Sequence, residues 1–267
     1  MIRLQPTPDL ARRRGKVKIR AHPTLAVGSL ALILWALVSK LELVSPVILP
    51  SPAQVASAFA TLLGHGNLLS DTALSFFRIT AGFVLAISLG VPIGFWAGTS
   101  RRAASALLPL SELIRYMPVP ALIPLVMVWF GVGEPAKVAI VFLGSFFQVV
   151  LMVAADVQRV PLEYRRVAQT LGATGWTLLR RVIWPASLPA LWDTGRLVLG
   201  WAWTYLVVAE LVAANAGLGY RILKAQRFFN TDEMLAMVIW LGLLGLAMDQ
   251  FLRHMHRRLF PWWEANR

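Results

Sequence analysis

The strongest constraint on this chain is a series of six long apolar windows, each near the length that a helix needs to cross a bilayer. They cover residues 23–39, 72–99, 107–130, 136–157, 188–214 and 233–255. A transmembrane helix needs about 20 mostly apolar residues, and backbone polar groups in lipid must be satisfied within the segment or by closing a barrel. Apolar runs this long, without alternating polarity, exclude the barrel. The sequence therefore predicts an all-α polytopic membrane protein with six transmembrane helices.

The charges support the same count, because their distribution over the loops is one-sided. The chain is 57% apolar, with a mean hydropathy of +0.64 and a formal net charge of +13. Six spans would place 18 of the 26 Lys and Arg residues on one side of the membrane. The positive-inside rule assigns that side to the cytoplasm. We therefore expect both termini to be cytoplasmic, and the basic charge to reflect topology rather than nucleic-acid binding.

Four regions are predicted along the chain. Residues 1–22 form a basic cytoplasmic arm, 23–71 hold the first transmembrane helix and an outer amphipathic segment, 72–255 form the core, and 256–267 form a cytoplasmic tail. In the outer segment, Ser51-Pro52 and Gly64 mark the ends of a helix, which either lies on the membrane surface or packs against neighbouring spans. The first window could instead be a signal peptide, although no small-residue cleavage site follows it before Lys40.

The third window is interrupted by four prolines. They are Pro109, Pro118, Pro120 and Pro124. Each proline inside a helix removes a backbone donor and clashes with the preceding turn. A span broken in this way is tolerated where it is buried in protein or lines a cavity. The pattern predicts a kinked helix, which is either a gate on a pathway or a packed kink without a transport role.

Several charged residues fall inside the predicted spans, where an unpaired charge is costly. Asp193 and Arg196 are three residues apart, as are Glu112 and Arg115, so each is expected to form a local pair. Asp249 is a further charged residue inside a predicted span. For the lone charges Arg78 and Glu210, we hypothesise that they pair between spans and support the outward mouth.

The basic segment between the fourth and fifth windows is too polar for lipid and too regular for a linker. Pro161 can begin a helix that runs to Leu171, and Gly172 stands where such a helix reverses. Thr174 can cap a second helix, which Pro185 would stop. A short helix displayed on the cytoplasmic side suits the groove of a partner protein. The alternative is an amphipathic helix that rests on the inner leaflet.

This segment resembles the coupling motif of ABC-importer permeases. With Gly172 aligned, Arg166, Val167 and Ala168 take the Glu-Ala-Ala positions of that motif, and 182–185 take its Ile-x-Leu-Pro tail. Arg166 replaces the acidic residue and Trp184 replaces Leu, so the acidic contact does not carry over. Further stretches, at 44–55, 115–137, 195–211 and 215–234, resemble the nitrate/sulfonate/taurine permease group. The resemblance covers about residues 44–255.

The resemblance implies a type I ABC importer permease fold in a bacterial inner membrane. It further implies two permease copies, as a homodimer or a heterodimer, two separate ATPase subunits that dock around 161–172, and a periplasmic or lipid-anchored binding protein. The ATPase-coupling residues would be Tyr164, Arg165, Arg166, Val167, Ala168, Leu171, Gly172 and Thr174. ATP and Mg would bind the partner subunits, and this chain needs no cofactor of its own. The chain lacks the phosphate loop G-x-x-x-x-G-K-[ST], in agreement with this expectation.

A small oxyanion, such as an aliphatic sulfonate, taurine or nitrate, is the substrate that the resemblance implies. The predicted pathway residues are Arg78, Arg115, Met117, Pro118 and Glu210, with Arg115 as the cation nearest an anionic substrate. Arg221, Lys224 and Arg227 form a predicted outer contact for the binding protein, and they are also compatible with an anionic substrate.

Two other classes of function compete with this interpretation. A secondary transporter or channel for a small anion would be favoured by inverted repeats or by more acidic residues at mid-membrane, and neither is evident. An intramembrane enzyme would need a catalytic set. The chain has no HExxH zinc motif and no cysteine, and its four histidines lie at or outside the span ends. We therefore expect no enzymatic activity in this chain.

Overall fold

The computed structural model describes residues 21–65 and 68–264, and this part of the chain is helical, without strands. The predicted basic arm at 1–22 lies almost wholly outside the described residues. The chain divides into two units, residues 1–52 and 53–267. In the first unit, helix α1 (Ala21–Lys40) covers the first predicted span, and the indole Nε1 of Trp35 donates to the carbonyl oxygen of Pro50 at 2.9 Å.

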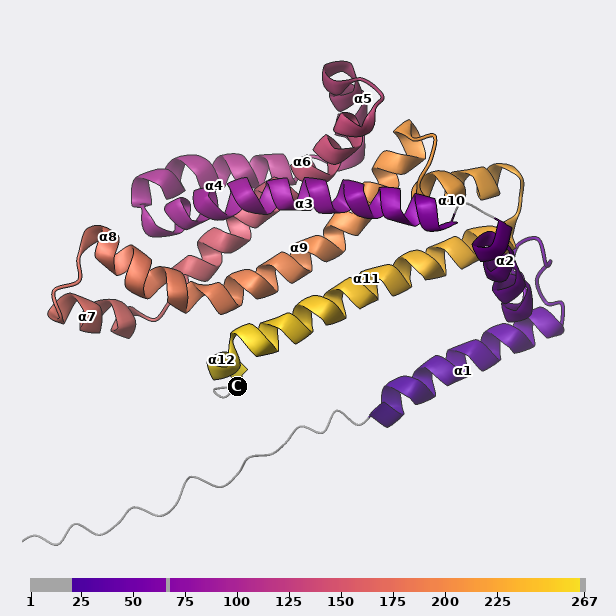
Figure 1. Ribbon diagram of the computed structural model, residues 1–267, viewed down its shortest axis with the longest axis horizontal. Helices are drawn as coiled ribbons and strands as arrows, with labels where there is room; N and C mark the ends of the chain where they lie inside the picture. Colours follow the sequence, from indigo (N-terminus) through magenta and orange to yellow (C-terminus); the bar gives the residue numbers. More distant parts are fainter. Residues whose placement is uncertain (1–20, 66–67, 265–267) are drawn as a thin grey trace, which may run out of the picture. The chain divides into compact units, whose positions relative to one another are not determined.

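The second unit is a succession of long helices joined by short connections (Figure 1). Its elements are α2 (Pro52–His65), α3 (Leu68–Thr99), α4 (Arg101–Arg115), α5 (Val119–Phe130), α6 (Glu134–Gln158), α7 (Leu162–Thr170), α8 (Gly175–Leu178), the π-helical turn η1 (Leu179–Ile183), α9 (Trp184–Ala213), α10 (Leu218–Arg227), α11 (Thr231–Leu259) and α12 (Pro261–Glu264). Figure 1 places α7 and α8 at one end of α9 and α10 at the other.

Four helical stretches of the described chain are long and apolar enough to cross a membrane. They are α3, α6, the continuous helix at 175–212 and α11. Helices α4 and α5 form a fifth candidate, bent by 100° at its break, and the apolar part of α1, Ala26–Lys40, is shorter than these. The all-helical fold is confirmed, whereas the predicted count of six is not matched exactly, because prolines break the third span.

Helices α3 and α6 pack so closely that glycine is required along their contact. A Cβ atom added to Gly82, Gly90, Gly94 or Gly98 would lie 2.7 Å from an atom of α6. The last three follow at four-residue spacing, which places small residues on one helix face and lets two backbones approach. Opposite them, α6 presents a row of valines that are almost fully buried. This seam forms the rigid centre of the second unit.

Helix α2 is the predicted outer amphipathic helix, and it packs against other helices of the unit. Val55, Ala58 and Leu62 are buried, and the ring of Phe59 lies 5.3 Å from that of Trp240 in α11. Val55, Phe59 and Leu62 of the predicted apolar face are therefore packed within the unit, whereas Leu63 of the same face is exposed.

Candidate functional site

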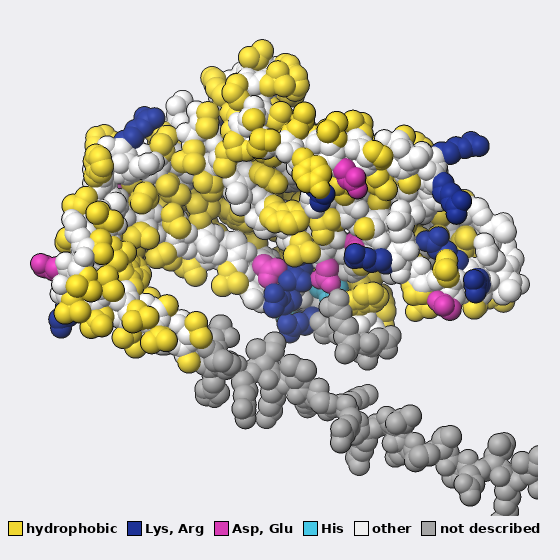
Figure 2. All heavy atoms as spheres, turned by 180° about the vertical axis from the view of Figure 1, so that it is seen from behind, with side chains coloured by type: hydrophobic (Ala, Val, Ile, Leu, Met, Phe, Trp, Pro, Cys, Tyr) yellow, Lys and Arg dark blue, Asp and Glu magenta, His cyan; other side chains and the backbone are white. Residues whose placement is uncertain are grey.

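Helix α7 stands out of the bundle as an exposed helix with apolar side chains on its surface. Tyr164 and Val167 are exposed, and Leu171, just after the helix, is 82% exposed. Gly172 has a φ of 82°, the left-handed conformation that glycine adopts most easily, and the chain reverses there as predicted. Figure 2 shows Lys and Arg side chains gathered at the end of the second unit that holds α7 and α8. Such a surface suits a protein partner.

Side-chain and backbone contacts connect α7 to the spans on both sides. Nη2 of Arg165 donates to the carbonyl oxygen of Val157 at the end of α6, at 3.1 Å, and Ala168 is buried. After α7, the chain passes through α8 and η1 directly into α9. Ile183 in η1 belongs to the same buried apolar cluster as Val157 and Val198. A force applied to α7 would therefore reach α6 and α9.

The predicted stop at Pro185 is wrong, because the helix continues through it into α9. The N–H of Trp184 bonds to the carbonyl of Leu179, five residues earlier, as in a π-helix. A π-turn leaves a carbonyl without its usual partner, so a proline that lacks an N–H fits directly after it. Thr174 stands at the N-cap position of α8, but its side chain forms no capping hydrogen bond.

At the opposite end of the unit, Arg78 is the centre of a buried charge cluster. Its Nη1 lies 2.7 Å from Oε1 of Glu210, as hypothesised from the sequence, and also donates to the carbonyl oxygen of Ala216. Its Nε and Nη2 bind both carboxylate oxygens of Glu134, at 2.6 and 2.7 Å. Lys137 lies 2.8 Å from Glu134. Arg78 and Glu210 are 1% and 0% exposed, so this pair is buried, whereas the side chain of Glu134 at the edge of the network is 43% exposed.

The same cluster holds the turn that leads into α10. Asp71 accepts from the backbone N–H of Gly217, Ser75 accepts from that of Leu218, and Glu210 accepts from that of Gly219. Gly217 has a φ of 117°, and an added Cβ there would meet the side chains of Arg78 and Glu210. The backbone around this turn is therefore fixed by the carboxylates and the hydroxyl beneath it.

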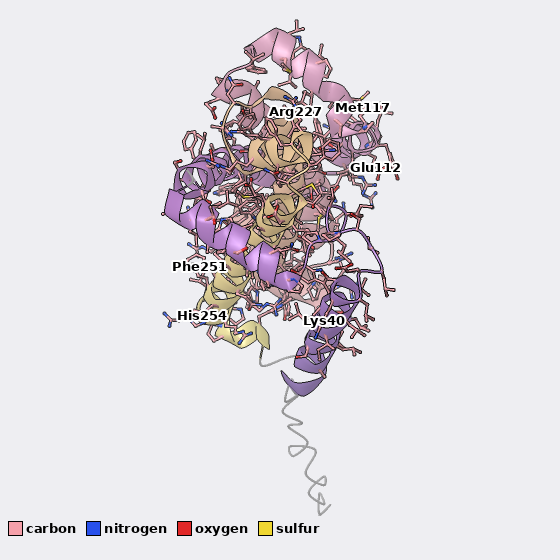
Figure 3. The ribbon with its side chains drawn as sticks, turned by 90° about the vertical axis from the view of Figure 1, so that its right-hand side faces the viewer. Lys40, Glu112, Met117, Arg227, Phe251 and His254 are labelled. Atoms are coloured by element: carbon pink, nitrogen blue, oxygen red, sulfur yellow. The ribbon has the colours of Figure 1, made fainter. Side chains whose placement is uncertain are left out.

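A third polar region lies at the break between α4 and α5. A cavity of about 300 Å³ is bounded there by the connection itself and by parts of α6 and α9. Its lining includes Arg115, Tyr116, Met117 and Pro118 from the break, Gly144, Phe147 and Gln148 from α6, and Tyr205 from α9. Met117 and Glu112 lie on one side of the second unit, and Phe251 and His254 project from α11 on the other (Figure 3).

The sequence matches the family described as "Binding-protein-dependent transport system inner membrane component" over residues 90–261. It is 37% identical to the taurine transport system permease protein TauC of Escherichia coli, over 90% of each chain. It is 34% identical to a putative aliphatic sulfonates transport permease protein, SsuC, of Bacillus subtilis, over 89% of this chain and 86% of the relative. The chain belongs to this family.

A solved structure shows that the fold is shared as well. An inward-facing form of the MetNI methionine ABC transporter superposes with a TM-score of 0.65 at 19% identity, covering 72% of this chain and 95% of that chain. The permease is thus an ABC-importer permease of the sulfonate and taurine group, with the importer permease fold. The family description places it in an inner membrane.

The structure separates the predicted pathway residues of the permease into two groups. Arg115, Met117 and Pro118 share the cavity at the broken span, whereas Arg78 and Glu210 lie in the buried cluster near α10. The predicted Glu112–Arg115 pair is wrong. Both side chains are exposed, and Nη2 of Arg115 donates to the hydroxyl of Tyr116 at 3.4 Å instead. An exposed ion pair gains little from contact.

The predicted binding-protein residues also differ from one another. Arg221 forms an ion pair with Asp71 and is 21% exposed, whereas Lys224 and Arg227 are exposed on α10. The predicted Asp193–Arg196 pair is present at 3.0 Å, and Asp249 of α11 joins it at 2.9 Å from Arg196. No group of three or more metal-ligand side chains occurs within residues 21–65 and 68–264.

Sequence reasoning missed three polar residues that matter to these sites. Glu134 begins α6 after a Gly-Val-Gly turn, where an acidic residue at a helix start is a common local feature. Gln148 and Tyr205 stand alone in apolar runs. The position of Gln148 near the middle of α6 is a signal in retrospect, since an amide at mid-membrane needs a partner or a function.

Proposed function

We propose that the permease forms the translocation pathway of an ATP-driven importer for a small oxyanion, such as an aliphatic sulfonate, taurine or nitrate. Separate ATPase subunits dock on α7, and an external binding protein delivers the substrate. Two copies of the permease, as a homodimer, enclose the pathway, and both termini face the cytoplasm. ATP and Mg are bound by the ATPase subunits alone. The exposed apolar surface of α7, held by the ends of α6 and α9, supports this proposal most directly.

The mechanism follows from the connection between α7 and the spans. Closure of the ATPase subunits displaces α7, and the turn η1 passes this movement into α9, which carries Tyr205 at the cavity. The broken span faces the same cavity from the other side. A rigid-body movement of α9 against α5 and α6 would therefore change access to the cavity, as in other transitions where packed elements shift as units.

The test is co-purification of an ATPase subunit with the tagged permease from its host in mild detergent, comparing wild type with Leu171→Arg. This position is 82% exposed, so the substitution leaves the bundle intact. Leu259→Arg, at the exposed end of α11, is the matched control. We expect the ATPase with wild type and Leu259→Arg but not with Leu171→Arg. Recovery of no ATPase with a monodisperse wild-type protein would contradict the proposal.

A further inference from the structure

We propose that the cavity at the broken span is a substrate site, in which a small oxyanion of the sulfonate class is bound between α5, α6 and α9 during its passage. This inference rests on the proposed function and adds the residues of a binding site within the membrane-spanning unit. It is carried by polar groups that lack partners and converge on one cavity.

The amide of Gln148 and the hydroxyl of Tyr205 are the first of these groups. Both line the cavity, and neither makes a hydrogen bond to another residue in the described part of the chain. Gln148 lies among apolar neighbours near the middle of α6. Both side chains are only partly buried, and their polar atoms are not among the buried ones that lack a partner, so they are open to the cavity. Two polar groups that face one cavity and bind no other residue can form hydrogen bonds to a ligand that enters it.

Arg115 supplies the charge that an oxyanion needs. Its guanidinium lies 5.0 Å from the ring centroid of Tyr116, and within residues 21–65 and 68–264 no carboxylate pairs with it. A free guanidinium binds planar or tetrahedral oxyanions through paired N–H groups. In addition, α5 begins at the cavity with Val119, after the N-cap Pro118. The positive end of its helix dipole favours an anion at the same place.

The shape of the cavity favours a small molecule with a short hydrocarbon part. Its volume of about 300 Å³ lies at the lower end of the range for ligand pockets, about 300–1,000 Å³. Leu122, Leu143 and Phe147 provide an apolar wall. Gly144 leaves room for the Tyr205 ring, because a Cβ there would lie 2.5 Å from that ring. The ring and its hydroxyl are therefore held at the cavity by a close contact with α6.

The test measures binding of radiolabelled taurine to the full-length permease in lipid nanodiscs, without binding protein. Ethanesulfonate and nitrate serve as competitors, and dimethyl sulfone serves as the uncharged analogue. Wild type should bind saturably, and the sulfonate should compete while dimethyl sulfone should not. Tyr205→Phe and Gln148→Leu should each weaken binding about tenfold, since each removes one hydrogen bond to a charged ligand. Gln158→Leu, at the exposed end of α6, should change affinity less than about twofold.

The inference fails if wild type binds none of taurine, ethanesulfonate and nitrate, if dimethyl sulfone competes as well as ethanesulfonate, or if both cavity variants bind like Gln158→Leu. Failure of the site is distinguishable from failure of the proposed function. A permease that co-purifies with its ATPase and supports ATP-driven uptake, yet binds no anion by itself, retains the proposed function without this site.

Discussion

The buried cluster around Arg78 and the cavity at the broken span are both polar regions within apolar helices, but they differ in how completely their groups are paired. In the cluster, the Arg78 guanidinium makes four hydrogen bonds, to Glu134, Glu210 and Ala216. At the cavity, Gln148 and Tyr205 have no partner among the described residues. The cluster holds the structure together, whereas the groups at the cavity remain available to a ligand.

The energetic reason is the cost of desolvation. Removing one member of a buried ion pair leaves an uncompensated charge in a medium of low polarity. Removing a polar group that is open to the cavity and bonds to no other residue leaves no partner uncompensated. Substitutions in the cluster should therefore lower the unfolding free energy strongly. Substitutions at the cavity should change it little but weaken ligand binding.

The largest effect is expected for Glu210→Leu in the cluster. The change leaves Arg78 short of a carboxylate and frees the N–H of Gly219 and the hydroxyl of Ser75. We expect the unfolding free energy to fall by about 3–5 kcal/mol, measured by thermal unfolding of the detergent-solubilised permease. Glu112→Leu, an exposed carboxylate in no ion pair with Arg115, is the control and should behave as wild type. Equal unfolding temperatures for Glu210→Leu and Glu112→Leu would show that the cluster does not stabilise the fold.

Gly94→Ala tests the close contact between α3 and α6. The new Cβ would lie 2.7 Å from the carbonyl oxygen of Val150, a backbone atom that cannot move aside alone. We expect a loss of about 1–3 kcal/mol in unfolding free energy in the same thermal assay, from overpacking. Gly242→Ala has open space around it and should be neutral. An unchanged unfolding temperature for Gly94→Ala would show that α3 and α6 separate more easily than their contact suggests.

Gly144→Ala should affect the cavity more than the fold. Its Cβ would meet the ring of Tyr205, a side chain that can turn into the cavity. The expected loss of stability is about 1 kcal/mol, together with loss of saturable taurine binding in nanodiscs. If binding survived with wild-type affinity, the ring position would not define the site.

Gln148→Leu should have the smallest effect on stability. Because the amide has no partner to lose, the unfolding free energy should stay within about 0.5 kcal/mol of wild type or rise. The matched comparison is Thr194→Val, which removes a buried hydroxyl that donates to Asp156 at 2.5 Å and should cost about 1–3 kcal/mol. A loss for Gln148→Leu as large as that for Thr194→Val would mean that the amide is paired in the folded protein.

Much of the fold could be predicted from the sequence, because long apolar windows and prolines act locally. The windows at 72–99 and 136–157 lie within α3 and α6, and the proline-rich window breaks at Met117-Pro118. Gly172 reverses the chain as its position after a helix indicates. The continuous helix through Pro185 was not predictable in this way, because a π-turn depends on packing around Ile183 rather than on the proline itself.

The candidate sites were only partly predictable, since side chains distant in sequence meet in space. The Arg78–Glu210 contact follows from two lone charges that fall at the same depth, but Glu134 and the Asp71–Arg221 pair carry no such signal. The three-residue spacing correctly predicted an ion pair for Asp193–Arg196, but the ion pair that it predicted for Glu112–Arg115 is not formed. The first pair is partly buried and gains from contact, whereas both side chains of the second are exposed. The roles of the α7 residues and of Lys224 and Arg227 stay predictions.

The most direct test of the importer account is uptake of radiolabelled taurine or ethanesulfonate into proteoliposomes that contain the permease and its co-purified ATPase subunits, with the binding protein outside and ATP inside or absent. The account predicts uptake that requires both ATP and the binding protein and persists when ionophores collapse the ion gradients. Uptake that needs a proton or sodium gradient and proceeds without ATP would contradict it and identify a secondary transporter.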